Sequence, residues 1–180
     1  MTRILIVEGN SPSLLAQGVA PAARPFVRTF GSLAPDLILR HAAPYDRPLT
    51  RADLDADGVV FTGSGDSWSA DAPQAAPQRA AMRAAFDAGL PVWGSCNGLH
   101  LATVVLGGAV GPSPNGQEAG WARDIRIRQP HPMLAQRQDG FAAPCIHRDE
   151  VRRAPSGACV LAGNSHSAVQ AMACVTGGGS

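Results

Sequence analysis

Residues 91–102 of the chain read Pro-Val-Trp-Gly-Ser-Cys-Asn-Gly-Leu-His-Leu-Ala. A short apolar stretch runs into a glycine-flanked cysteine, Cys96, and a sequence typical of a helix follows at once. This order matches a nucleophile elbow, the sharp turn between a buried strand and a helix, with cysteine in place of serine. The stretch therefore predicts an α/β fold with Cys96 at the nucleophile position.

Each part of the turn around Cys96 has a physical reason. Gly94 and Gly98 relieve crowding where strand and helix approach each other, and the tight turn exposes the sulfur, often with backbone strain. The helix N-terminus favours thiolate over thiol, and the N–H of Asn97 can point at a developing oxyanion. A buried cysteine beside packing glycines is the alternative, and the five-residue pattern alone leaves both interpretations open.

The rest of the first half alternates strands and helices. Apolar runs bounded by turn residues predict strands at Ile4–Val7, Leu37–Leu39, Val59–Phe61 and Val92–Trp93. Continuous apolar runs are typical of strands covered on both faces. Helices are expected at 13–20, 22–33, 77–88 and 97–106. This alternation predicts a doubly wound, mostly parallel α/β sheet flanked by helices.

The second half has a different pattern. Residues 122–128 alternate polar and apolar side chains, as a half-exposed antiparallel strand does. Residues 159–162 and 168–175 resemble a hairpin pair, so we expect an antiparallel C-terminal extension. The last residues, Thr-Gly-Gly-Gly-Ser, read as a loop. We therefore expect a single domain over residues 1–180 that is incomplete at its C-terminus.

Composition excludes several classes of function. The 180 residues are 45% hydrophobic and 16% charged, which fits a soluble globular protein. The net charge of +1 provides no strong field for nucleic acid or a membrane surface. All 15 basic residues are arginine, which excludes a lysine nucleophile and a P-loop. With neither a leader nor a membrane-spanning run, a cytoplasmic location is expected.

The chain has four cysteines, and none of them forms a CxxC pair. The spacing therefore disfavours a zinc site or a thioredoxin-type motif, and no metal or cofactor is expected. Apart from Cys96, the cysteines are expected to be small buried hydrophobic residues: Cys145, Cys159 and Cys174.

A second segment supports a role for Cys96. Residues 57–67 read Asp-Gly-Val-Val-Phe-Thr-Gly-Ser-Gly-Asp-Ser, a strand that ends in a Gly/Ser loop. Ligands bind at the carboxyl ends of the strands in a doubly wound sheet. The N–H groups of Gly63, Ser64 and Gly65 are therefore candidates for a second oxyanion donor. An ordinary tight turn is the alternative.

Together the two segments resemble the class I, or triad, glutamine amidotransferases, which include the glutaminase domain of GMP synthase. The similarity is closest to the small stand-alone members, and it implies a flavodoxin-like fold. Residues 146–151, Ile-His-Arg-Asp-Glu-Val, resemble the family's His-x-Asp-x-Val loop, which borders the glutamine site. The resemblance therefore implies that His147 and Arg148 bind substrate. Residues 160–172 resemble the strand pair that leads towards the rest of the triad.

Two departures from the family pattern stand out. The family has Gln four residues after the nucleophile, where it touches substrate, whereas this chain has His100. His100 could instead pair with a thiolate or cap a polar edge. The family's base is the His of a His-Pro-Glu motif, which the 180 residues lack; His131-Pro132 is followed by Met133 and is expected to start a short helix. His147 with Asp149, or His166, is an alternative base.

The resemblance implies that Cys96 hydrolyses the glutamine side-chain amide through a thioester and releases ammonia. The expected partners are glutamine or a γ-glutamyl small molecule and an ammonia-accepting enzyme, with no nucleic acid or membrane. His100 motivates one alternative, a γ-glutamyl amide hydrolase on the same fold. The absent His-Glu pair motivates another, a catalytically inactive fragment or pseudoenzyme.

Overall fold

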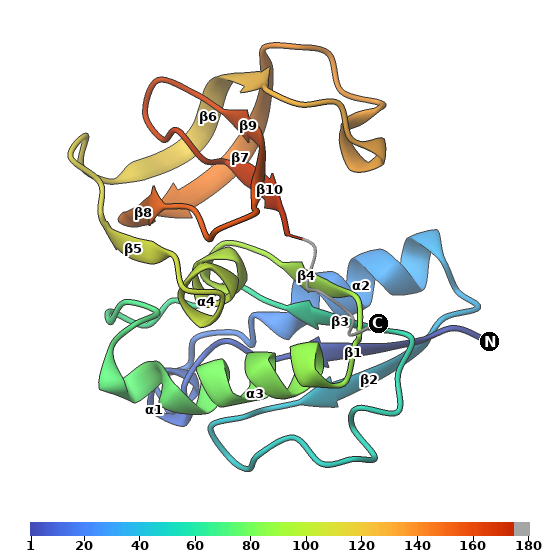
Figure 1. The fold of residues 1–180 in the computed structure, drawn as a ribbon. Coiled ribbons are helices and arrows are strands. Elements are labelled where there is room, and N and C mark those ends of the chain that lie inside the picture. Colours follow the sequence, from blue (N-terminus) through green and yellow to red (C-terminus); the bar gives the residue numbers. More distant parts are fainter. Residues whose placement is uncertain (175–180) are drawn as a thin grey trace. The chain divides into compact units, whose positions relative to one another are not determined.

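The computed structural model describes residues 1–174 of the chain (Figure 1). These residues belong to two compact units, the first spanning Met1–Val105 and the second beginning at Leu106. The expectation that they form one domain stays a prediction. No helix within residues 1–174 combines the length and apolar character that crossing a bilayer requires.

The first unit is a parallel sheet with helices on both faces. Its elements in chain order are β1 (Arg3–Val7), α1 (Pro12–Ala16), α2 (Ala23–Leu33), β2 (Ile38–Ala42), β3 (Gly58–Phe61), η1 (Pro73–Ala75), α3 (Ala76–Asp87), β4 (Val92–Gly94) and α4 (Asn97–Val105). The strand order is β2-β1-β3-β4, and every pair in this sheet is parallel. The four predicted strands and the predicted fold class are confirmed.

The apolar run of β1 supplies two separate core layers. Leu5 and Val7 pack in one cluster with side chains of α3 and α4, whereas Ile6 packs in another with side chains of α2. All three side chains are fully buried. Full burial of such a side chain contributes about 1.5–3 kcal/mol. The run is continuous because both faces of the strand are covered.

A carboxylate just beyond the end of β1 caps helix α2, which has no capping side chain of its own at Ala22. Glu8 is 1% exposed and accepts the N–H groups of Ala22 at 2.9 Å and Ala23 at 3.0 Å. Helix N-termini favour negative charge, and these hydrogen bonds satisfy the buried carboxylate. Glu8 thus joins the end of the first strand to helix α2.

The second unit is antiparallel throughout its described pairs. Its elements are β5 (Ala109–Pro112), β6 (Glu118–Ile127), η2 (Pro132–Leu134), β7 (Phe141–His147), β8 (Asp149–Arg153), β9 (Cys159–Gly163) and β10 (Ala171–Ala173). One sheet has the order β10-β9-β6-β7, and β5 pairs with β8. The predicted hairpin of β9 and β10 is confirmed, as is the short helix at Pro132; Val175 of the predicted second strand lies outside the described residues.

Strand β6 contains a bulge. Ala122 pairs with Ala143 and Ile125 with Phe141, so β6 has one residue more than β7 across this interval. Asp124 takes the extra position with φ of 51°. Ala122 and Ile125 are consequently both buried in one cluster. The bulge explains why the predicted simple alternation does not extend along the whole strand.

The cysteines in the second unit are more accessible than the sequence suggests. Cys145 and Cys174 are half-buried, and Cys159 is exposed. The prediction of a buried side chain is therefore wrong for Cys159. Cys159 lies at the first position of β9, where the outward face is open.

Asp53 anchors the loop between β2 and β3. Its carboxylate accepts Arg47 Nη1 at 2.6 Å, the Thr50 N–H at 2.8 Å and the Thr50 hydroxyl at 2.7 Å. Hydrogen bonds from Arg47 hold the pKa of Asp53 well below its ordinary range; burial opposes this shift, and Thr50 reinforces it.

We expect Asp53→Asn to lower the free energy of unfolding at pH 7 by about 2 kcal/mol, because it removes charge-assisted hydrogen bonds from a buried group. The folded-state pKa is depressed, so this stabilisation is present above the unfolded-state pKa of about 3.9 and is lost as the pH falls towards the folded value. Urea unfolding at pH 7 and pH 3 measures both effects.

Asp55→Asn is the matched control. Asp55 pairs with Arg3 but its side chain is 64% exposed, so the expected loss is below about 1 kcal/mol. Equal losses for the two variants at pH 7 would contradict the role assigned to Asp53.

Candidate active site

Cys96 occupies the strained turn that the sequence predicts. It lies between the last residue of β4 and the first residue of α4, and its φ is 51°. Only Asp124 shares a positive φ among the described residues other than glycine. A left-handed conformation costs a non-glycine residue about 1–3 kcal/mol and is concentrated at functional sites. The side chain of Cys96 is exposed, as a nucleophile requires.

Two glycines make the turn sterically possible. A Cβ on Gly94 would lie 2.5 Å from the backbone of Gly98, and a Cβ on Gly98 would lie 2.5 Å from the carbonyl oxygen of Phe61. The N–H of Ser95 donates to the same Phe61 oxygen at 2.9 Å. The start of α4 is thus pressed against the carboxyl ends of β3 and β4.

The loop after β3 borders Cys96. A Cβ on Gly63 would lie 3.4 Å from Cys96 Cβ and 3.9 Å from its sulfur. Gly63 also lies close to the loop after β1, because a Cβ on Gly9 would lie 2.1 Å from the Gly63 carbonyl oxygen. The loops after the adjacent strands β1 and β3 therefore come together with the elbow, as expected for a doubly wound sheet.

Three of the four proposed oxyanion donors are available. Within residues 1–174, the backbone N–H groups of Gly63, Ser64 and Asn97 donate to no acceptor. By contrast, the N–H of Gly65 donates to Asn10 Oδ1 at 2.9 Å. This geometry favours Gly63, Ser64 and Asn97 over Gly65, although their roles stay predictions.

Side chains fix the shape of the Gly/Ser loop. Asp66 accepts the Ser11 hydroxyl at 2.6 Å, the Ser11 N–H at 2.8 Å and the Ser64 hydroxyl at 2.9 Å. The loops after β1 and β3 are therefore joined by hydrogen bonds, which hold the backbone of residues 63–65 in place.

His100 is half-buried and lies one helical turn after Cys96. Its backbone N–H donates to the Cys96 carbonyl oxygen at 3.2 Å, which places both residues on the first turn of α4. Its predicted part in substrate binding stays a prediction.

His147 and Arg148 belong to the second unit. His147 ends β7, and its Nε2 lies 3.0 Å from Glu118 Oε2 while its Nδ1 lies 3.1 Å from the Asp149 carbonyl oxygen. Within residues 1–174, His147 therefore contacts the backbone carbonyl of Asp149, whereas a base-orienting pair would use the carboxylate. Arg148 Nε donates to Asp149 Oδ1 at 3.0 Å, with the arginine side chain 55% exposed. Substrate binding by both stays a prediction.

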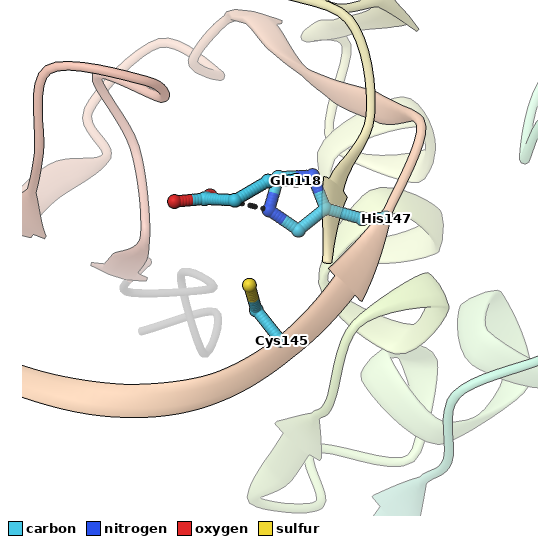
Figure 2. A group of neighbouring side chains, drawn as sticks. All are labelled: Glu118, Cys145 and His147. Atoms are coloured by element: carbon cyan, nitrogen blue, oxygen red, sulfur yellow. Dashed lines mark hydrogen bonds and ion pairs between the residues drawn. The ribbon is translucent and has the colours of Figure 1, made fainter. Parts of the chain in front are cut away.

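Glu118, which no sequence motif indicates, is the centre of a polar cluster in this unit, and Figure 2 shows it beside His147. Asn164 donates to Oε1 at 2.8 Å and Gln170 to Oε2 at 2.7 Å, and His166 Nδ1 lies 3.6 Å from Oε2. Burial alone would raise the pKa of Glu118, but these amides and the nearby imidazoles lower it below its ordinary value.

Comparison with known proteins agrees with this geometry. The model of the family "Glutamine amidotransferase class-I" matches residues 37–177. The chain belongs to this family.

Relatives within the family differ in their named reactions. The chain is 34% identical over 175 residues to a gamma-glutamyl-L-1-hydroxyisopropylamide hydrolase from Pseudomonas sp., covering 90% of this chain and 59% of that protein. It is 37% identical over 97 residues to a glutamine-hydrolyzing GMP synthase subunit from Methanoculleus marisnigri, covering 53% of this chain and 52% of the other. The chain thus spans little more than half the length of these relatives.

Solved structures support the fold. The crystal structure of a glutamine amidotransferase from Thermotoga maritima aligns with a TM-score of 0.74 at 16% identity. The alignment covers 96% of this chain and 71% of the other. At this identity the likeness establishes the fold alone.

We expect Gly98→Ala to lower the free energy of unfolding by about 2 kcal/mol or more, because the new methyl group meets a backbone oxygen that cannot move independently. Gly31→Ala in α2 is the control, since its Cβ would meet no atom of residues 1–174 within 4 Å apart from its chain neighbours and its own helix backbone. That change should stabilise the protein by about 0.5 kcal/mol through helix propensity. Chemical denaturation measures both, and a neutral Gly98→Ala would contradict the close approach.

Proposed function

We propose that the chain provides the nucleophile half of a γ-glutamyl amide-cleaving site, with glutamine as the simplest substrate. The observation that carries this proposal is the exposed, left-handed Cys96 at the start of α4, beside backbone N–H groups that have no acceptor within residues 1–174. Family membership supports the same chemistry.

The proposed reaction begins with attack of the Cys96 thiolate on the side-chain amide carbon. The C–N bond breaks, the leaving nitrogen takes up a proton, and a γ-glutamyl thioester remains on sulfur. Water then cleaves the thioester, releasing glutamate and regenerating the thiol. In the family, the histidine of the His-Pro-Glu motif moves these protons, and the 180 residues contain no such motif.

The oxyanion of each tetrahedral intermediate would lie between the N–H of Asn97 and an N–H of Gly63 or Ser64. Preorganised donors of this kind typically contribute about 2.7–4 kcal/mol each to transition-state stabilisation. Because these donors are backbone groups, the hydrogen bonds that fix the loop, and not side-chain identity at residues 63 and 64, should determine their alignment.

A second candidate is cleavage of an N-substituted γ-glutamyl amide. It is favoured by the similarity to the Pseudomonas hydrolase and by His100 at a position where the family has glutamine. In this case an amine leaves in place of ammonia, and the thioester steps are unchanged. For glutamine as substrate, the GMP synthase relatives favour a separate enzyme that accepts the ammonia.

The first test is labelling of the nucleophile with a chloroketone analogue of glutamine at neutral pH. We expect Cys96 to react at least about tenfold faster than the same thiol in denatured protein, because an unperturbed thiol is only a few per cent ionised at this pH. L-glutamine should protect it. Mass spectrometry of the digested protein identifies the labelled residue.

Cys96→Ala should lose this label, whereas Cys159→Ser should keep it, since Cys159 is an exposed thiol in the other unit. Labelling that is indifferent to glutamine, or that survives in Cys96→Ala, would overturn the proposed nucleophile.

The two candidate substrates are separated by His100→Gln. If the leaving group is a substituted amine, wild-type kcat/KM should be higher for N-alkyl γ-glutamyl amides than for glutamine. His100→Gln should shift the ratio of these two kcat/KM values towards glutamine by about tenfold, which corresponds to the loss of one hydrogen bond. Glutamate release measures both reactions. An unchanged ratio would exclude His100 from substrate choice.

A further inference from the structure

We propose that Glu118, Cys145 and His147 form a binding site for a divalent metal ion of the Zn²⁺ class. This inference goes beyond the proposed function, because it concerns the second unit and involves no step at Cys96. It rests on the convergence of three different ligand types from two strands (Figure 2).

Strand pairing creates the convergence. Glu118 of β6 lies directly opposite His147 of β7, and Cys145 precedes His147 by two residues on the same strand face. Gly120 lies opposite Cys145, so no side chain fills the position beside the sulfur. One carboxylate oxygen, one ring nitrogen and the sulfur all lie within 4.8 Å of one another.

These separations are close to those of a metal site. Zn²⁺ ligands at about 2.0–2.3 Å from the ion lie about 3.3–3.7 Å apart across a tetrahedron. The Glu118–His147 separation of 3.0 Å is shorter because the two atoms share a hydrogen bond, and side-chain rotation alone can open it.

Neighbouring groups already hold two ligands in place. The Asp149 carbonyl oxygen lies 3.1 Å from His147 Nδ1, so it can accept the proton there and leave Nε2 as the ligand atom. Asn164 holds the other oxygen of Glu118 at 2.8 Å. Outer contacts of this kind orient ligands in metal sites and fix the histidine tautomer.

The local charge also favours a cation. The side chains of Glu118 and His147 are only 11% and 14% exposed. A divalent ion would offset the negative charge of the Glu118 carboxylate, and coordination by the Cys145 sulfur would release the thiol proton.

The ligand set selects the ion. One thiolate, one imidazole and one carboxylate suit Zn²⁺ or Co²⁺ better than Mg²⁺ or Ca²⁺, which prefer oxygen. Three protein ligands leave a fourth position for water or a small molecule. His166 lies beside the proposed site, with its Nδ1 3.6 Å from Glu118 Oε2. Its Nε2 is buried and has no hydrogen-bond partner in the described part of the chain.

Titration of the full chain with Co²⁺ tests the site, because thiolate coordination gives a near-ultraviolet charge-transfer band. We expect the band to saturate at one equivalent and to be displaced by Zn²⁺. Cys145→Ser should abolish the band, and Glu118→Gln should weaken binding by more than the roughly 10–100-fold that loss of an outer contact costs. Circular dichroism confirms that each variant is folded.

Cys159→Ser and Cys96→Ala are the controls, and both should retain the band and its stoichiometry. Proton release on Zn²⁺ binding should fall by one in Cys145→Ser, which reads out the site without cobalt. A band that persists in Cys145→Ser, or that disappears only in Cys96→Ala, would overturn the proposal. Because the readout is not turnover, failure here leaves the Cys96 labelling result unaffected.

Discussion

The carbonyl oxygen of Phe61 leaves no room for a side chain at residue 98, and the arrangement of the first unit depends on this contact. The same oxygen accepts the N–H of Ser95, so the end of β3 determines where β4 stops and where α4 begins. Cys96 lies between Ser95 and Gly98, whose positions these contacts fix, and it adopts a left-handed backbone conformation. Packing of apolar layers on both sheet faces compensates for this local strain.

The loops around Cys96 are held by polar contacts that reach back to β1. Gly9 permits the approach of Gly63, and Asp66 joins the two loops through Ser11. Glu8 meanwhile caps α2 from the end of the same strand. One strand end therefore positions both a helix and the edge of the candidate active site.

Local sequence patterns were sufficient for the elbow, the four parallel strands and the β9–β10 hairpin, because each depends on residues close together in the chain. The Glu118 cluster could not be found in this way. Its members come from strands whose register depends on a bulge, and β7, with Pro144 inside it, does not read as a strand. Likewise, only the fold shows that Asn10 engages the N–H of Gly65, 55 residues away.

The bulge at Asp124 determines which side chains of β6 share a face of the sheet. Glu118 and Ile125 both point to the inner side of their sheet although their offset along the chain is odd, which a regular strand would forbid. Because of the extra residue, the side chains before and after the bulge that face the inner side of the sheet lie on the same face of β6. Removing the extra residue would leave the two faces of β6 as they are, whereas removing one residue elsewhere in the paired strand would exchange them.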